Sequence, residues 1–469
     1  MYKRQVDKNS PPIRLLSPAG SPQAYFAGFG WSGNGAALPG PDTVWNASGP
    51  VLSPSTPVTL SWDNGQGQRF EIALSIDDTY MISAVQKVTN AGAAPVAVKP
   101  YALVSRVGQS IDTSTRTIRV GPIGTFNGAT DYGINYKDLA PGQPARTFQS
   151  TGGWLGFTEK YWLVAIAPDQ RVPFTASLRG GTGDRYQADA ALAPVVVAPG
   201  QASQTTMRLF AGAKEVNVLQ RYENQLGIAN FDRAIDWGWF EIIEKPIFWV
   251  LDHLFWLTGN FGVAIILLTC VVRGLMFPVA QKQFKSMAGM RAVQPKMKAL
   301  QERYKDDKQT LQQEMLKLYQ QEKVNPLSGC APIVIQIPIF YALYKVLMLT
   351  IEMRHQPFAL WIKDLSAPDP LSPVNLFGLL PFTPPHAIAL GVLPILLGIT
   401  MWLQFKLNPQ PMDPMQKQVF SIMPWIFMFV MAPFAAGLQL YWTVSNLLTI
   451  AQQKWLYSRH PALKEAPAK

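Results

Sequence analysis

Residues 261–277 of the chain read FGVAIILLTCVVRGLMF, with Arg273 as the single charged side chain. A helix that crosses the hydrocarbon core of a bilayer needs about 20 mainly apolar residues, with a range of about 17–25, so this run predicts a transmembrane helix. Four further apolar runs follow, at residues 330–350, 387–403, 419–434 and 438–451. The last two of these runs are short, so to cross the bilayer their flanking side chains must reach toward the headgroups or the bilayer must thin. The C-terminal half, residues 259–460, therefore predicts a membrane α-helical bundle of five transmembrane helices.

The N-terminal half has a different composition. Residues 1–235 are rich in Gly, Pro, Ser and Thr and contain none of the long apolar runs. Within residues 69–76, every second side chain from Phe70 to Ile76 is apolar, which is the pattern of a half-buried strand. Further strand-like segments lie at residues 161–166, 195–197 and 207–210. Short strands separated by Gly- and Pro-containing turns predict an all-β sandwich domain over residues 1–235.

The two halves are joined by a segment that mixes tryptophan with charge. Residues 236–258 contain Trp237, Trp239, Trp249 and Trp256 among acidic and basic side chains. The segment is too charged to cross a bilayer, whereas tryptophan rings favour the headgroup level. It predicts an amphipathic helix that lies in the membrane interface. A packed helix of a soluble domain is the alternative.

Loop charges predict the orientation of the bundle. The segment 281–325 carries ten Lys or Arg and five Asp or Glu, whereas 351–384 carries two basic and three acidic residues. Residues 403–418 carry two basic and one acidic residue, and residues 452–469 carry four and one. Cytoplasmic loops are the basic ones. This places 281–325, 403–418 and the tail in the cytoplasm, and the β-sandwich domain and 351–384 outside it.

The basic segment 281–325 also carries two apolar stripes at helical spacing. They predict a cytoplasmic helical hairpin in which Asn325-Pro326 ends the second helix, and Pro295 is expected to weaken or kink the first helix. The stripes consist of Met287, Met290, Val293, Met297, Leu300 and Tyr304 in the first helix, and Leu311, Met315 and Leu318 in the second. Methionine-rich stripes are typical both of a core and of an adaptable binding surface, and both readings stay open.

Arg273 is the residue that calls for an explanation. A charged side chain at the centre of a bilayer costs roughly 2.5–3.5 kcal/mol on insertion scales. One reading is that Arg273 extends to inner-leaflet phosphates. However, none of the five apolar runs contains Asp or Glu, so the bundle offers no internal partner. An arginine without a partner in a water-filled pocket is a receptor for a negative charge from outside the chain.

Polar residues on the predicted helices are candidates to line that pocket. Thr269 lies one turn from Arg273 on the same helix face, and Gln336, Tyr441 and Asn446 lie in other runs. Interhelical hydrogen bonding is the alternative for each of them. The second cation of the bundle, Lys345, lies near the outer end of its run and is expected to snorkel to the headgroups.

Composition excludes several classes of protein. The formal net charge is +11, which fits basic cytoplasmic loops as well as nucleic acid, so no specific nucleic-acid partner is predicted. Cys270 and Cys330 both lie in apolar runs, which argues against a disulfide framework. The sequence contains no metal-ligand spacing and no P-loop, and its four histidines are scattered outside the β-rich half. We therefore expect no cofactor, no metal and no catalytic residue.

Seven short segments stand out in order over residues 237–460. They are Val272-Arg273-Gly274, Gln294-Pro295-Lys296, Glu322-Lys323-Val324-Asn325-Pro326-Leu327, Gln336-Ile337-Pro338-Ile339-Phe340, Pro357-Phe358-Ala359-Leu360-Trp361-Ile362, Asp413-Pro414-Met415-Gln416 and Val444-Ser445-Asn446-Leu447. These segments resemble the YidC family of membrane protein insertases in its Gram-negative form, and Gly152-Gly153-Trp154 resembles the family's periplasmic domain more weakly over residues 45–235. The family's first transmembrane helix has no counterpart here, so a preceding segment is expected to be missing. The family commonly has a Tyr-Tyr pair in its last helix. This chain has Tyr441-Trp442 at that place, so whether the second position of the pair makes a polar contact stays open.

The resemblance implies an insertase of the bacterial inner membrane with a hydrophilic groove open to the cytoplasm and the lipid. Arg273 would attract acidic residues in the short extracellular tail of a substrate, and Ile337, Phe340 and Val430 would line a hydrophobic slide for its apolar segment. The implied partners are nascent membrane proteins, the Sec translocon, the ribosome, the signal recognition particle receptor and membrane lipid. A polytopic transporter or channel is the alternative, although it would require intramembrane acids, inverted repeats or a polar pore. An enzyme acting on envelope sugars is a third reading.

Overall fold

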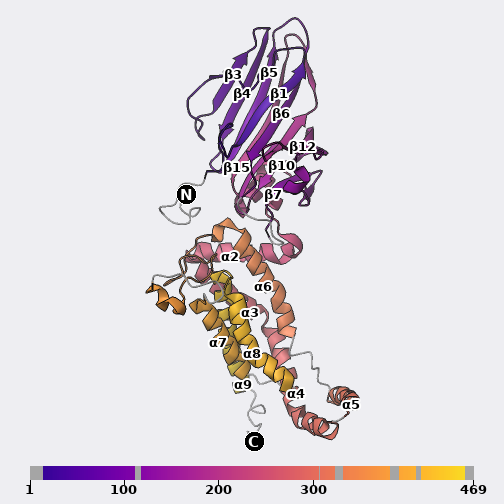
Figure 1. Ribbon diagram of the computed structural model, residues 1–469, viewed down its shortest axis with the longest axis vertical. Helices are drawn as coiled ribbons and strands as arrows, with labels where there is room; N and C mark the ends of the chain where they lie inside the picture. The colour runs from indigo at the N-terminus through magenta and orange to yellow at the C-terminus, as the bar shows by residue number, and fades with distance from the viewer. Residues whose placement is uncertain are drawn as a thin grey trace. The chain divides into compact units, whose positions relative to one another are not determined.

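The computed structural model describes residues 14–110, 118–305, 307–322, 331–380, 390–407 and 414–459. The chain divides into two compact units (Figure 1). The β unit contains residues 1–238 and 349–352, and the helical unit contains residues 239–348 and 353–469.

The β unit is built from two antiparallel sheets (Figure 1). The first sheet has six strands in the order β1-β6-β13-β12-β9, with β14 also paired to β6, and the second has nine in the order β2-β3-β4-β5-β15-β11-β10-β7-β8. One helix of this unit, α1 (Val216–Leu226), follows the last strand. The strands are β1 (Tyr25–Asn34), β2 (Asn46–Ala47), β3 (Val58–Asp63), β4 (Gln68–Ile76), β5 (Met81–Asn90), β6 (Val96–Val107), β7 (Gly121–Phe126), β8 (Ala129–Asp131), β9 (Arg146–Thr151), β10 (Gly153–Thr158), β11 (Trp162–Pro168), β12 (Pro173–Gly181), β13 (Arg185–Leu192), β14 (Val195–Val197) and β15 (Ala202–Ala213).

The alternation of side chains sets the face that each strand buries. In β4, Phe70 and Ile72 are buried and Arg69 is exposed, as the alternating pattern predicts. The strands predicted at residues 161–166, 195–197 and 207–210 correspond to β11, β14 and β15, and β11 begins one residue later than predicted. The prediction of an all-β sandwich is therefore confirmed.

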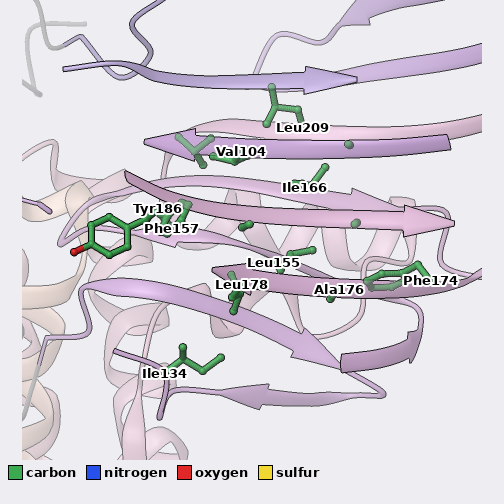
Figure 2. Packing of buried hydrophobic residues seen from close by; sticks show 14 of the residues in the cluster. Val104, Ile134, Leu155, Phe157, Ile166, Phe174, Ala176, Leu178, Tyr186 and Leu209 are labelled. Atoms are coloured by element: carbon green, nitrogen blue, oxygen red, sulfur yellow. The ribbon is translucent and has the colours of Figure 1, made fainter. Parts of the chain in front are cut away.

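The core lies between the two sheets (Figure 2). Side chains from β6, β12 and β13 of the first sheet pack against side chains from β10, β11 and β15 of the second. Among the buried members of this cluster are Val104, Leu155, Phe157, Ile166, Phe174, Leu178 and Leu209. In Figure 2 the hydroxyl of Tyr186 points away from the cluster, and it donates a hydrogen bond of 3.0 Å to Asp184 Oδ1. Burial of these apolar side chains from both sheets is what holds the sandwich together.

The Gly152-Gly153-Trp154 motif has a structural explanation. Gly153 has a φ of 111°, and a Cβ atom there would stand 2.0 Å from the carbonyl oxygen of Thr125 on β7. Glycine is therefore required at this close approach between β10 and β7. Trp154 is fully buried, and its ring packs edge-on against Phe231 at a centroid distance of 5.4 Å.

The helical unit contains eight α-helices within the described residues. They are α2 (Glu241–Thr258), α3 (Phe261–Leu275), α4 (Phe277–Arg303), α5 (Lys308–Gln321), α6 (Ala331–Leu349), α7 (Val392–Leu407), α8 (Pro414–Met431) and α9 (Ala436–Arg459). Each of the five predicted apolar runs coincides with one helix, namely α3, α6, α7, α8 and α9. Residue 330 and residues 387–389 of the predicted runs lie outside the described part of the chain. In the ranges that are described, none of the helices is at once long enough and apolar enough to cross a lipid bilayer.

Two close contacts organise the segment between α6 and α7. A Cβ atom on Gly262 would stand 2.0 Å from the ring of Phe358, so this segment packs tightly onto the first turn of α3. The buried carboxylate of Asp369 accepts hydrogen bonds from Trp361 Nε1 at 2.9 Å and from the backbone N–H of Leu393 at 2.7 Å. The carboxylate thereby satisfies one N–H of the first turn of α7, a donor that has no partner within the helix.

Helices α4 and α5 pack against each other through members of both predicted stripes. Val293, Met297 and Leu318 form a buried cluster that Leu300 and Met315 flank. Lys296 Nζ lies 2.5 Å from Glu322 Oε1 at the edge of this cluster. Helix α4 is continuous through Pro295 and does not break there. The side chains of Met287 and Met290 lie outside the described part of the structure.

Candidate functional site

Arg273 lies in the last turn of α3 and is partly buried. Asn260 caps the N-terminus of this helix, and its side-chain oxygen accepts hydrogen bonds from the N–H groups of Gly262 and Val263. The Nε of Arg273 donates a hydrogen bond of 2.9 Å to the hydroxyl of Ser445 on α9, and Nη2 donates to the same oxygen. Ser445 is only 2% exposed. The guanidinium is thus attached to a neighbouring helix through a neutral group.

No acidic partner stands beside this guanidinium among the described residues. A guanidinium has five N–H donors, and Ser445 accepts from two of its nitrogens. Tyr441, also on α9, is close enough to interact electrostatically with Arg273. The site therefore keeps both its positive charge and unused hydrogen-bonding capacity.

Gln336 and Tyr441 add a second polar contact. The side-chain amide of Gln336 on α6 donates a hydrogen bond of 2.6 Å to the hydroxyl of Tyr441, which is almost fully buried. Arg273, Ser445, Tyr441 and Gln336 therefore form one polar cluster that joins α3, α9 and α6. We call these four residues the Arg273 cluster.

Thr269 and Asn446 make their hydrogen bonds elsewhere. The hydroxyl of Thr269 donates to the carbonyl of Ile265 in its own helix at 2.7 Å, and the side chain is fully buried. The side-chain amide of Asn446 donates to the hydroxyl of Thr400 on α7 at 3.2 Å. These are the intrahelical and interhelical bonds that polar side chains commonly make in helical bundles. No hydrogen bond joins either residue to Arg273, and their predicted role in a groove stays a prediction.

The three residues predicted to form a slide differ in exposure. Ile337 on α6 is 60% exposed and Val430 on α8 is 52% exposed. Phe340 is partly buried, and its ring packs edge-on against Trp442 with the centroids 4.6 Å apart. The ring of Trp442 also lies 4.8 Å from that of Phe427 on α8. Ile337 and Val430 therefore offer open apolar surface, whereas Phe340 contributes to an aromatic contact between helices.

Sequence reasoning missed Ser445 as a partner of Arg273. A signal was present, because Ser445 lies four residues after Tyr441 and so shares a face of α9 with it. It also belongs to the quoted motif Val444-Ser445-Asn446-Leu447. A serine in a helix usually bonds its own backbone, and this weakens the signal.

The expectation that Lys345 snorkels to the headgroups is wrong. Lys345 on α6 is 3% exposed, and its Nζ lies 3.8 Å from the carboxylate of Glu244 on α2, which is fully buried. A buried cation needs a counter-charge, and the amphipathic segment before the first apolar run supplies it. Glu244 lies before the first apolar run, so the composition of the five runs gave no sign of this pair.

The β unit buries an arginine in another way. Arg106 Nη1 lies 3.1 Å from Glu159, and the guanidinium lies over the ring of Tyr25 at 4.7 Å. Burial raises the pKa of the neighbouring Tyr136 to about 12, so this phenol stays protonated at neutral pH.

The arrangement around Arg106 does not resemble a sugar-hydrolysing site. The carboxylate of Glu159 faces an arginine, whereas sugar hydrolysis uses a pair of carboxyl groups. Among the described residues no group of three or more His, Cys, Asp or Glu side chains is placed to hold a metal ion.

Two family profiles match the chain. The profile described as YidC periplasmic domain matches residues 1–250, and the profile described as 60Kd inner membrane protein matches residues 253–464. The first match covers all the described strands and α1, and the second covers α3 to α9. The class of protein is therefore an inner membrane protein with a periplasmic β domain.

Relatives with similar sequences identify the class more closely. A membrane protein insertase YidC of Zymomonas mobilis subsp. mobilis is 52% identical over 99% of this chain and 80% of its own length. One of Beijerinckia indica subsp. indica is 47% identical over 98% of this chain and 78% of its own length. A solved structure described as an active YidC insertase with its first transmembrane domain resolved matches 90% of this chain and 82% of its own, at 22% identity and a TM-score of 0.41.

The chain belongs to the YidC family of membrane protein insertases. The resemblance drawn from the seven motifs is thereby confirmed. The function is the insertion of membrane proteins, which are the substrates, and the family is not a family of enzymes. The transporter and the sugar-enzyme readings do not hold.

Proposed function

We propose that this insertase captures the acidic tail of a substrate at the Arg273 cluster. The observation that carries the proposal is the bonding of Arg273 to the hydroxyl of Ser445, with no acidic partner among the described residues. A guanidinium bound to a carboxylate would already be neutralised. One bound to a hydroxyl keeps a full positive charge and free N–H donors.

The physical need for such a receptor comes from desolvation. A polar tail that crosses lipid loses water from its backbone and its charges, which is costly. A hydrated groove shortens the dry path, and a positive charge in a low-dielectric site attracts an anion more strongly than the same charge in bulk water. The membrane potential adds roughly 2.3 kcal/mol per charge per 100 mV for an acidic tail that moves outward.

We propose five membrane crossings at α3, α6, α7, α8 and α9, with the β unit in the periplasm and residues 461–469 in the cytoplasm. The charge bias of the connecting segments supports this orientation. Helix α2 would lie in the interface as the segment 236–258. One side of α2 is buried through Glu244, Ile247 and Leu251, and the other exposes Ile242, Trp249 and Trp256, which suits the headgroup region.

Ile337 and Val430 would form the slide along which the apolar segment of the substrate enters the lipid. Their open side chains on α6 and α8 support this role. Phe340 has less free surface because Trp442 covers part of its ring. We propose that Phe340 supports the slide by fixing α6 against Trp442 of α9.

Helices α4 and α5 would form the cytoplasmic hairpin at residues 281–325. The apolar stripe between them is a core, which supports the structural reading of Val293, Met297 and Leu318. The exposed basic side chains of the hairpin would face the ribosome, the signal recognition particle receptor or anionic lipid. The Sec translocon is a further proposed partner, and nothing here requires a nucleotide or a cofactor.

The test is insertion into proteoliposomes of matched substrates whose short tails differ only in acidic residues. Arg273→Ala is expected to slow the acidic-tail substrates by about tenfold relative to neutral-tail ones, which corresponds to the loss of about one charge-assisted contact. Arg273→Lys keeps the charge but loses the planar pair of N–H donors, so it is expected to retain only part of the preference. Equal rates for both tails in the wild-type protein, or an unchanged ratio in Arg273→Ala, would show that Arg273 is not the receptor.

A further inference from the structure

Ser445 holds one edge of the Arg273 guanidinium. Its oxygen accepts hydrogen bonds from Nε, at 2.9 Å, and from Nη2. A serine hydroxyl has two lone pairs, so these two bonds use its accepting capacity. The remaining N–H groups of Arg273 are on Nη1 and on the second position of Nη2. One N–H of Nη1 and the remaining N–H of Nη2 point in parallel out of the edge between these two nitrogens, which is the free edge.

That free edge has the geometry which carboxylates favour. Arginine and a carboxylate commonly pair through two parallel N–H···O bonds, and this pairing requires a guanidinium whose plane and direction suit the anion. Fixing the guanidinium before the anion arrives removes the entropy cost of ordering it at the moment of binding. Ser445 itself is held in α9 and is 2% exposed, so it is a fixed point for this purpose.

The neutrality of Ser445 matters as much as its position. A carboxylate at residue 445 would orient the guanidinium equally well, but it would cancel the charge that attracts the substrate. A small apolar residue would preserve the charge, but it would leave the long side chain free to turn among its rotamers. A hydroxyl meets both requirements, because it accepts hydrogen bonds and carries no charge.

We propose that Ser445 is a positioning residue that sets Arg273 to receive a carboxylate of the substrate's tail on its free edge. This inference rests on the proposed role of Arg273 as the receptor. It adds that the preference for acidic tails depends on the direction of the guanidinium as well as on its charge. Ser445 does not touch the substrate in this scheme and acts through Arg273.

The experiment measures, for each variant of the full chain in proteoliposomes, the ratio of the insertion rate of an acidic-tail substrate to that of its neutral-tail counterpart. A general loss of folding or of active protein lowers both rates and cancels in this ratio. Ser445→Ala is expected to lower the ratio about threefold, less than the tenfold of Arg273→Ala, because the charge at residue 273 remains and only its orientation is lost. Ser445→Thr keeps the hydroxyl and is expected to restore the ratio. Ser421→Ala, at an exposed serine of α8 that bonds only its own helix, is the matched control and should leave the ratio at the wild-type value.

A third variant covers the case in which Ser445→Ala fails to accumulate. Ser445→Asp places a carboxylate beside the guanidinium and is expected to reduce the ratio to that of Arg273→Ala. A wild-type ratio in Ser445→Asp would overturn the inference. So would a wild-type ratio in Ser445→Ala, or a Ser445→Thr variant that behaves like Ser445→Ala.

Arg273→Ala, measured in parallel, separates the two proposals. If Arg273→Ala lowers the ratio and Ser445→Ala does not, the receptor stands and the positioning role is wrong. If Arg273→Ala leaves the ratio unchanged, the receptor itself is wrong and the positioning role falls with it.

Discussion

The β unit and the helical unit each bury an arginine, and the two guanidinium groups are bonded in different ways. Arg106 lies against Glu159 at 3.1 Å and over the ring of Tyr25. Arg273 bonds the hydroxyl of Ser445 and has no acidic partner among the described residues. The charge of Arg106 is paired inside the fold, whereas Arg273, the proposed receptor, bonds only a neutral hydroxyl there. A cation paired with a carboxylate also occurs in the helical unit, where Lys345 lies beside the buried Glu244.

The comparison teaches that burial of a cation does not by itself mark a binding site. Buried ion pairs within a fold are satisfied by carboxylates and hydrogen bonds, and removing one partner destabilises the protein. A buried cation whose hydrogen bonds go to neutral groups contributes less to the fold. The binding role that we propose for Arg273 rests on this difference. Substitutions at the paired and unpaired sites should therefore separate stability from function.

The largest expected loss of stability follows from Glu244→Gln. This change removes the counter-charge 3.8 Å from Lys345 in a site where both side chains are almost fully buried. The free energy of unfolding should fall by about 3–5 kcal/mol, the usual cost of breaking a buried pair. Denaturant unfolding of the detergent-solubilised protein measures it. A loss below about 1 kcal/mol would mean that this pair is not a structural contact.

Arg106→Met and Arg273→Met test the comparison directly. Arg106→Met leaves Glu159 without its guanidinium and should lower the free energy of unfolding by about 1.5–3 kcal/mol. Arg273→Met removes bonds to one neutral hydroxyl and should cost about 1 kcal/mol or less. Unfolding curves followed by tryptophan fluorescence compare the two variants. The reverse order of effects would break the distinction between the two arginines.

The smallest effect is expected at a surface pair. Lys296 lies 2.5 Å from Glu322, but both side chains are substantially exposed. Exposed ion pairs contribute about 0–1 kcal/mol because water and salt screen them. Lys296→Met should therefore change the unfolding free energy by less than about 1 kcal/mol in the same assay. A larger change would indicate that the packing of α4 on α5 depends on this pair.

The sequence predicted the local patterns well and the long-range contacts poorly. Alternation from Phe70 to Ile76 predicted β4, and the five apolar runs coincide with five helices, because burial on one face or along a whole helix leaves a pattern in the sequence. Charge and position singled out Arg273. By contrast, the partners of Arg273 and Lys345 lie 172 and 101 residues away along the chain. Such pairs leave no local pattern.

Hydrogen-bonding residues on helices show the same limit. Thr269, Gln336, Tyr441 and Asn446 were equally plausible neighbours of Arg273 from their positions. In the structure, only Tyr441 and Gln336 join the cluster, while Thr269 bonds its own helix and Asn446 bonds α7. Helix rotation and packing decide which polar side chain meets which. These depend on the whole bundle.

Charge reversal at Arg273 tests the central claim most directly. Matched substrates with acidic, neutral and basic tails are inserted into proteoliposomes without an applied membrane potential, by the wild-type protein and by Arg273→Glu. The wild-type protein should insert the acidic tail fastest, and Arg273→Glu should invert the order so that the basic tail is fastest. The same order of tails in both proteins would contradict a receptor that acts through the charge of residue 273.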